Sequence, residues 1–157
     1  MKRIAILSDT HGLLRDEVRE RLAGADVILH GGDVDTPGIV AAMRELGETY
    51  VVRGNNDKEW AGDLPQSLTV TIEGVRFFLV HKKKDVPQDL KDVDVVVCGH
   101  SHRYREETVD GVLWLNPGSC GRQRFDLELT MCVMEVEQGK YRVKRVLIPR
   151  DGAAGRR

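Results

Sequence analysis

The chain has 157 residues, of which 41% are hydrophobic, and this length fits one domain with a sizeable core. Lys and Arg total 24 against 25 Asp and Glu, so the formal net charge is −1. This balance argues against the broad basic surface of a protein that binds long nucleic acids, but it does not exclude a small phosphorylated ligand, because metal ions can supply local positive charge.

The first half of the chain alternates patterns typical of buried strands and of helices. Ile4–Leu7 is a continuous apolar run, as expected of a strand buried on both faces, and Leu13–Ala23 has apolar residues at helical spacing before Gly24. Thr36 and Pro37 indicate the N-cap and first turn of a second helix. We expect strands at 4–7, 26–30 and 50–52, and helices at 13–23 and 37–46. This βαβαβ order predicts parallel strands joined by right-handed crossovers.

The second half of the chain favours hairpins. Three short polar segments, Glu73-Gly74, Asp110-Gly111 and Gln138-Gly139-Lys140, each separate two apolar runs, as expected of tight turns. The strands expected beside them are 68–72 and 75–80, 108–109 and 112–115, and 131–136 and 141–148; a further buried strand is expected at 93–98. We therefore predict an α/β fold with two mixed sheets packed face to face and helices outside. Residues 1–150 should form one domain, followed by a frayed tail at 151–157.

The sequence favours a cytoplasmic protein. Its N-terminal apolar run is only four residues long and ends near Asp9, so it predicts neither a signal peptide nor a membrane span. The three cysteines, Cys98, Cys120 and Cys132, are odd in number and widely spaced, which indicates reduced thiols. Cys98 and Cys132 lie in apolar runs and are expected to be buried.

Polar side chains capable of binding metal follow five of the predicted strands. The carboxyl ends of strands form the ligand crevice in open α/β sheets, so these residues should meet at one edge. Each residue alone has an ordinary alternative, as a turn residue or a polar side chain satisfied by hydrogen bonds. The joint pattern, which includes four of the five histidines, favours a site. In chain order the residues are Asp9, His11, Asp33, Asn55, His81, His100 and His102.

This set of donor atoms predicts transition-type divalent ions. Carboxylate and imidazole together suit manganese, iron, zinc, cobalt or nickel, whereas an all-oxygen site would have suggested magnesium or calcium. Seven residues are too many for one tetrahedral ion but suit two ions that share a bridging carboxylate. Two ions about 3.5–4 Å apart can clamp the attacking and leaving oxygens of a phosphoryl displacement and generate hydroxide at neutral pH. We therefore expect hydrolysis of a phosphate ester.

These residues also carry a family resemblance. Asp9-Thr10-His11, Gly32-Asp33, Gly54-Asn55, His81 and Gly99-His100-Ser101-His102 occur in the order of the calcineurin-like metallophosphoesterase family. The length and the segment Asn116-Pro117-Gly118-Ser119 resemble the small bacterial and archaeal phosphodiesterase branch, from Met1 to about Ile148. The resemblance implies a four-layer α/β/β/α sandwich and a phosphodiesterase active with manganese or nickel.

The resemblance also assigns the ligands. It implies that one ion is held by Asp9, His11, Asp33 and His102, and the second by Asp33, Asn55, His81 and His100. Hydroxide bridging the two ions would attack phosphorus in line, and Asp33, Asn55 and His100 would take part in catalysis. We expect two divalent ions, with manganese first and nickel, iron, zinc and cobalt as alternatives.

Two departures from the family pattern bear on the chemistry. Asn56 stands where many members have a histidine, and the small branch often a cysteine; asparagine cannot protonate a leaving oxygen near pH 7. Good leaving groups are therefore favoured, unless Asp57, His30 or a metal-bound water substitutes. His81 is followed by three lysines, 82–84, where the family commonly has Gly-His. A lysine run is more often a solvated loop than a phosphate site.

The sequence leaves open the roles of several further residues and several alternative functions. Residues 116–119 should form a rigid turn beside the site, Arg122 and Arg124 could clamp a phosphate, and His30 could support a ligand or face solvent. Alternatives to a phosphodiesterase are a phosphomonoesterase, a nuclease of short substrates, or a catalytically weak or inactive interaction scaffold with the same fold, like the retromer subunit. The resemblance also allows a homo-oligomer.

Overall fold

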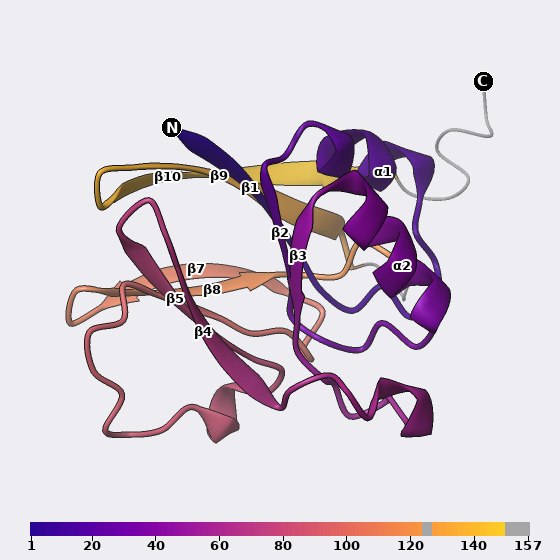
Figure 1. The fold of residues 1–157 in the computed structure, drawn as a ribbon, viewed down its shortest axis with the longest axis horizontal. Helices are drawn as coiled ribbons and strands as arrows, with labels where there is room; N and C mark the ends of the chain where they lie inside the picture. The colour runs from indigo at the N-terminus through magenta and orange to yellow at the C-terminus, as the bar shows by residue number, and fades with distance from the viewer. Residues whose placement is uncertain (124–126, 150–157) are drawn as a thin grey trace.

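The computed structural model describes residues 1–123 and 127–149, which form two five-stranded sheets packed face to face (Figure 1). In the first sheet the strand order is β10 (Lys140–Ile148), β9 (Leu129–Glu137), β1 (Lys2–Leu7), β2 (Val27–His30) and β3 (Glu48–Val51). In the second it is β4 (Ser67–Ile72), β5 (Val75–Val80), β6 (Val95–Val97), β8 (Val112–Pro117) and β7 (Tyr104–Val109). The predicted mixed sheets are confirmed.

The pairing of parallel strands brings their carboxyl ends level with one another. In the first sheet β1 pairs with β2 in parallel, with Leu7 opposite His30, so the segments that begin at Ser8 and Gly31 leave the sheet together. In the second sheet β5 and β6 are parallel, with Leu79 opposite Val97. Loops that carry the predicted site residues therefore leave each sheet side by side.

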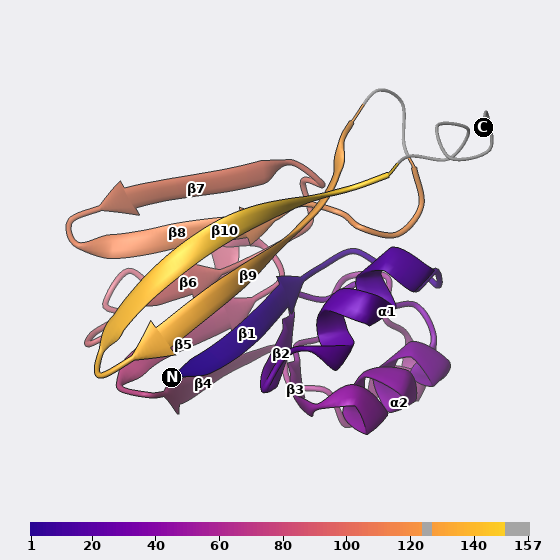
Figure 2. The same cartoon turned by 90° about the horizontal axis from the view of Figure 1, so that it is seen from above.

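Alternation along β1 explains why its apolar run is continuous. Ile4 and Ile6 belong to the core between the sheets, together with Phe77, while Ala5 and Leu7 belong to the core beneath the helices. Helices α1 (Asp16–Ala23) and α2 (Pro37–Leu46) cover this second face of the first sheet (Figure 2). Because both faces are covered, every residue from Ile4 to Leu7 has an apolar environment.

The outer face of the second sheet has a thinner cover. Phe78, Val80 and Val96 pack there against Val86 and Leu90 of the connection between β5 and β6, which contains the 3₁₀ turn η2 (Lys83–Asp85). The four layers are thus α, β, β and a short helical turn with its loop. A second 3₁₀ turn, η1 (Glu59–Ala61), follows β3.

Element boundaries differ from the prediction where local hydrogen bonds compete with periodicity. Helix α1 begins at Asp16 rather than Leu13, because Leu13 N–H bonds to the carbonyl of Thr10 and Arg15 is extended. The strands predicted at 50–52 and 93–98 span 48–51 and 95–97. All three hairpins are confirmed, with two consecutive positive φ angles in each turn, as in a type I′ turn. The last turn has two residues, Gln138 and Gly139. The predicted tail at 151–157 lies outside the described residues.

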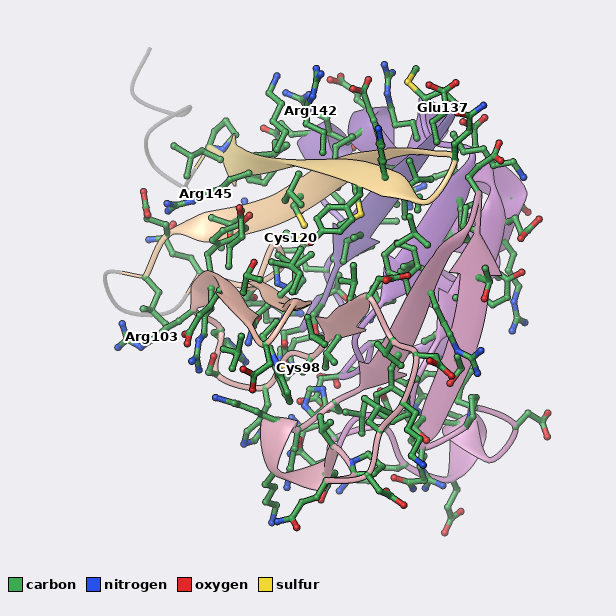
Figure 3. All side chains as sticks on the ribbon, turned by 90° about the vertical axis from the view of Figure 1, so that its left-hand side faces the viewer. Cys98, Arg103, Cys120, Glu137, Arg142 and Arg145 are labelled. Atoms are coloured by element: carbon green, nitrogen blue, oxygen red, sulfur yellow. The ribbon has the colours of Figure 1, made fainter. Side chains whose placement is uncertain are left out.

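The three cysteines are free and buried. Figure 3 shows Cys98 and Cys120 inside the molecule and Glu137 and Arg142 at its surface. None of the helices in the described ranges is long and apolar enough to cross a membrane.

Candidate metal centre

Six of the seven predicted site residues come together in two neighbouring groups. Asp9, His11 and His102 form the first group, and in each group the donor atoms lie within 4.8 Å of one another. The second group contains Asp33, His81 and His100.

The backbone that presents these side chains has an uncommon conformation. Left-handed φ angles, between 47° and 76°, occur at Asp9, His11, Asp33, His100 and His102. This conformation costs an L-residue about 1–2 kcal/mol, so the surrounding structure must hold it in place. Two backbone hydrogen bonds between the loops do so: Asp9 N–H bonds to the carbonyl of Gly32, and His11 N–H to that of Asp33. Strain of this kind is typical of functional sites.

The first group has the dimensions of a metal site. Asp9 Oδ1 lies 3.6 Å from His11 Nε2 and 3.4 Å from His102 Nε2, and the two Nε2 atoms are 3.2 Å apart. Ligands that are each about 2.0–2.2 Å from one ion lie about 2.8–3.6 Å from one another. The donor atoms of this group therefore fit around a single divalent ion.

Asp33 lies between the two groups. Its Oδ2 is 3.1 Å from His81 Nε2 and 3.7 Å from His11 Nε2. His100 completes the second group at its exposed side, with its ring 5.3 Å from that of His81, edge to face. One oxygen of Asp33 thus faces donor atoms of both groups, which is the position of a bridging carboxylate.

Hydrogen bonds fix the tautomers of two histidines. His81 Nδ1 donates to the carbonyl of Gly31 at 2.7 Å, and His11 Nδ1 donates to Asp35 Oδ2 at 3.0 Å. With the proton on Nδ1, each Nε2 presents a lone pair to the carboxylates. Asp9 Oδ1 and His81 Nε2 are both buried without a hydrogen-bond partner, 3.9 Å apart. Lone pairs that face one another in this way repel unless a proton or a metal ion lies between them, so the residues fit the predicted ions.

The pKa shifts agree with a cation-binding site. Burial acts to raise the pKa of Asp9, but its interactions with His102 and His11 hold it well below the usual range. Burial also acts to raise the pKa of Asp33, but the interaction with His81 holds this pKa below its usual value. The Asp9 carboxylate raises the pKa of His11; for His81 burial acts to lower the pKa, but Asp33 raises it overall. The carboxylates therefore stay ionised at neutral pH, and protons compete with metal at the two histidines.

Each carboxylate of the two groups has one oxygen that accepts hydrogen bonds from the protein and one that accepts none from the backbone. Asp9 Oδ2 accepts hydrogen bonds from Ser8 Oγ and from the backbone of His100. Asp33 Oδ1 accepts one from the backbone of Asn56. The other oxygen of each carboxylate is the one that faces the histidines.

Two glycines allow the backbone to approach these carboxylates. A Cβ at Gly54 would lie 2.2 Å from Asp33 Oδ1, and one at Gly99 would lie 2.5 Å from Asp9 Oδ2. A side chain at either position would displace the neighbouring carboxylate, so glycine is needed there because it leaves enough space.

Asn55 is placed beside the second group. It is exposed and lines a cavity of about 370 Å³ together with His81 and Lys82, and its side-chain nitrogen donates to Asn56. Its role as a ligand stays a prediction. Lys82, which stands where the family commonly has glycine, has an ordinary φ of −107°, so the backbone at this position does not need glycine.

Neither side chain considered as a substitute for Asn56 is placed to protonate a leaving group. His30 is buried, its Nδ1 accepts a bond from Gly32 N–H and its Nε2 donates to Thr10 Oγ1, and burial lowers its pKa to about 4. Asp57 is buried, and its oxygens accept backbone N–H bonds from Asp33, Gly54 and Asp35. Both residues support the loops that carry ligands.

The segment around Asn116 also supports the site. Asn116 Nδ2 donates to the carbonyl of Gly99 and to Ser101 Oγ, and its Oδ1 accepts Gly118 N–H. Ser119 Oγ donates to the carbonyl of Asp9. This turn therefore connects the loops after β1 and β6.

Of the two arginines considered as a phosphate clamp, Arg122 donates from Nε to the carbonyl of His11. Arg124 lies outside the described residues. The contact of Arg122 supports the loop after β1.

Asp35 is a candidate functional residue that the sequence reasoning missed, because its carboxylate accepts the hydrogen bond from His11 Nδ1. Its position two residues after Asp33 is the available sequence signal. We expect Asp35→Asn to weaken metal binding about 10–100-fold, because a carboxylate that orients a ligand histidine and raises its basicity has an effect of this size. Isothermal titration of chelator-treated protein with manganese measures the change. The exposed control Asp63→Asn should bind normally; equal affinity of both variants would rule out the role of Asp35.

Comparison with known proteins agrees with this geometry. Residues 1–139 match the sequence profile described as the calcineurin-like phosphoesterase superfamily domain. A probable metallophosphoesterase of Mycoplasma pneumoniae is 32% identical, over 96% of this chain and 100% of its own length. A phosphodiesterase of Methanocaldococcus jannaschii is 28% identical, over 89% of this chain and 96% of its own.

Solved structures are similar over nearly the whole chain. A Thermotoga maritima protein determined by NMR is 28% identical, with a TM-score of 0.70 and coverage of 94% of this chain and 100% of that one. The zinc complex of Entamoeba histolytica Vps29 is 20% identical, with a TM-score of 0.71 and coverage of 92% and 98%. At that identity the likeness to Vps29 concerns the fold alone.

Proposed function

Because the chain belongs to the calcineurin-like phosphoesterase superfamily, we propose that it is a phosphodiesterase that uses two divalent metal ions. The observation that carries the proposal is the position of Asp33 Oδ2, which faces histidine nitrogens of both groups at 3.1 and 3.7 Å. The relative from M. jannaschii, which is named a phosphodiesterase, supports the choice of diesters.

The proposed ligands divide between the two ions. Asp9, His11 and His102 would hold the first, and His81, His100 and Asn55 would hold the second, with Asp33 shared between them. Manganese is the expected metal, with nickel, iron, zinc and cobalt as alternatives, since nitrogen and oxygen donors suit all of them. When bound, such ions neutralise charge on the phosphate and lower the pKa of a coordinated water, which becomes a nucleophile at neutral pH.

The reaction adds water across one ester bond. A bond forms between the water oxygen and phosphorus, the bond from phosphorus to one ester oxygen breaks, and the departing oxygen gains a proton. Asp33, Asn55 and His100 are proposed to contact the reacting groups. Asn56 cannot donate the proton, and His30 and Asp57 are buried in hydrogen bonds to the loops. With these side chains excluded, water is the remaining source of the proton, and leaving groups that are stable as anions, such as a phenolate, are favoured.

Turnover of bis(p-nitrophenyl) phosphate tests the proposal. Chelator-treated protein should be inactive and should regain activity with manganese or nickel. A parallel panel of p-nitrophenyl monoesters and alkyl diesters should show slower turnover of both. Absence of metal-dependent turnover from the whole panel would contradict the proposed enzyme.

The alternative is an interaction scaffold, supported by the likeness in fold to Vps29. A scaffold has no need to preserve a strained constellation of buried carboxylates and histidines, and we therefore favour the enzyme. Turnover distinguishes the two: the enzyme should bind about two ions per chain and hydrolyse a diester in their presence, whereas a scaffold should hydrolyse none of the panel with any of the metals.

A further inference from the structure

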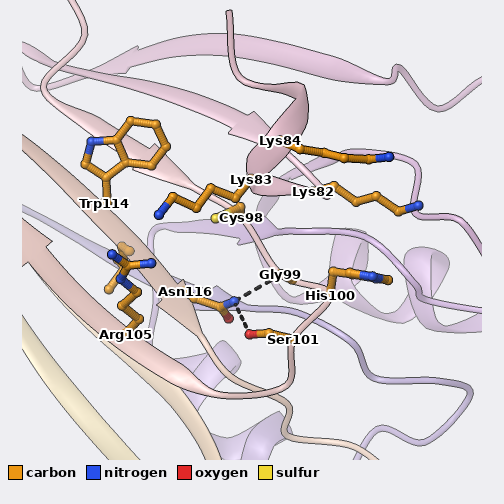
Figure 4. A pocket seen from close by; sticks show the side chains of 11 residues that line it. Lys82, Lys83, Lys84, Cys98, Gly99, His100, Ser101, Arg105, Trp114 and Asn116 are labelled. Atoms are coloured by element: carbon orange, nitrogen blue, oxygen red, sulfur yellow. Dashed lines mark hydrogen bonds between the residues drawn. The ribbon is translucent and has the colours of Figure 1, made fainter.

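A large cavity adjoins the candidate metal centre on the side of His100. It has a volume of about 490 Å³ and lies between the lysine run that follows β5 and the outer face of β8 (Figure 4). His100 forms one end, and Trp114 and Arg105 form the other. A group attached to a phosphate at the metal centre could thus extend into this cavity.

The charged side chains that line the cavity are all cationic among the described residues: Lys82, Lys83, Lys84 and Arg105. The whole chain has a formal net charge of −1, so this local excess of positive charge is a specific feature of the cavity. Arg105 is paired with Glu107, and both side chains are about half exposed. Lys83 forms no ion pair within the described part of the chain. The charge favours an anionic ligand.

Trp114 provides a flat aromatic wall. It lies half-buried on β8, packed beside the core residues Phe78, Val80 and Val96, so its ring cannot move freely. Lys83 Nζ lies 5.6 Å from the ring centroid, as in a cation–π contact. Figure 4 shows this ammonium group between the indole and Arg105. An aromatic ligand on the ring and an anion between the two cations would therefore be neighbours.

The residues at the base of the cavity are held in place by burial and hydrogen bonds before any ligand binds. Cys98 is buried beneath Lys83, and Asn116 donates hydrogen bonds to Gly99 and Ser101 of the adjoining loop (Figure 4). A preformed cavity reduces the conformational cost of binding.

We propose that this cavity binds one ester group of the substrate, and that this group carries an aromatic base and a further phosphate, as in a phosphorylated nucleotide. Trp114 stacks on the base, and Lys83 and Arg105 pair with the phosphate. The proposal rests on the proposed phosphodiesterase function and narrows its substrate class from diesters in general to nucleotide diesters.

Three substrates with the same leaving group test the inference. They are thymidine 3′-phosphate 5′-(p-nitrophenyl phosphate), the same compound without its 3′-phosphate, and methyl p-nitrophenyl phosphate. We expect Lys83→Gln combined with Arg105→Gln to lower kcat/KM about tenfold for the first compound and less than twofold for the other two. Trp114→Leu should affect both nucleotides and spare the methyl ester. Lys91→Gln, in the same connection but outside the cavity, is the control.

Fluorescence gives a readout that does not depend on turnover. The chain has two tryptophans, so a Trp60→Phe background reports Trp114 alone. Thymidine 3′,5′-bisphosphate should quench this signal, with affinity about tenfold weaker after the Lys83 and Arg105 substitutions and unchanged after Lys91→Gln. Inorganic phosphate should bind much more weakly.

The outcomes separate the two proposals. Suppose that the methyl ester is hydrolysed in a metal-dependent way, and that each substitution changes kcat/KM equally for all three compounds. This result would overturn the proposal of a nucleotide-binding cavity and leave the proposed phosphodiesterase function intact. Quenching of Trp114 without turnover of any compound would overturn the phosphodiesterase. Absence of quenching by the bisphosphate would overturn the cavity proposal whatever the activity.

Discussion

Replacing Asp33 with Asn is expected to lower kcat/KM for bis(p-nitrophenyl) phosphate by about 10³-fold or more. Asp33 Oδ2 faces histidine nitrogens of both groups, at 3.1 and 3.7 Å, and an amide in its place removes charge that would hold two cations together. Charge stabilisation by metal ions contributes several kcal/mol to such reactions, and about 4 kcal/mol corresponds to 10³-fold in rate. Steady-state kinetics at saturating manganese measure the loss, and elemental analysis should find fewer than two ions per chain.

The matched control for this variant is Asp63→Asn, which makes the same chemical change at an exposed residue. It should keep wild-type turnover and metal content. Circular dichroism of Asp33→Asn should show an unchanged fold, since Asn can still accept the hydrogen bond from Asn56 N–H. Activity of Asp33→Asn within tenfold of wild type would contradict a bridging role.

Manganese is expected to stabilise the metal-free protein strongly. A ligand present at 100 times its dissociation constant adds about 2.7 kcal/mol to the free energy of unfolding, which for a chain of this length raises Tm by about 5–10 °C per site. The physical cause is the pair of buried, unpartnered atoms Asp9 Oδ1 and His81 Nε2, whose lone pairs face each other until a cation is bound. Thermal unfolding with increasing manganese measures the shift.

The shift should shrink as pH falls. The pKa values of His11 and His81 are raised in the metal-free protein, so at lower pH these groups bind protons that metal must displace. Asp63→Asn should respond to manganese as the wild type does, and Asp33→Asn should respond much less. A Tm of the wild type that is independent of manganese, nickel, iron, zinc and cobalt would contradict the proposed cation site.

The architecture could be predicted well from the sequence, because a strand that is buried on both faces has a continuous run of apolar residues. Ile4–Leu7 is apolar at every position because the core between the sheets takes one set of alternate residues and the helices take the other. The three hairpin turns were recognisable from a glycine at the second turn position. Helix α1 was predicted three residues too early, because Leu13 fits the apolar spacing although its N–H bonds to Thr10 in a turn.

The candidate site was predictable in its members but not in its geometry. Strand ends and residue order pointed to seven side chains, and the structure brings six of them together. Nothing in the sequence predicted left-handed φ angles at Asp9 or His102, because residue type signals this conformation mainly through glycine. Nor did it predict that Asp35 would orient His11, because this contact depends on how two loops meet.

The close approach of Gly54 and Gly99 to the ligand carboxylates has a consequence for how relatives are judged active. A chain could retain all seven proposed ligand side chains and still be inactive if alanine replaced either glycine, since the new methyl group would occupy space held by Asp33 Oδ1 or Asp9 Oδ2. Mutational scans should therefore find these two glycines as intolerant as the ligands themselves. A sequence comparison that checks only whether the metal-binding residues are present would classify such a chain as an active enzyme.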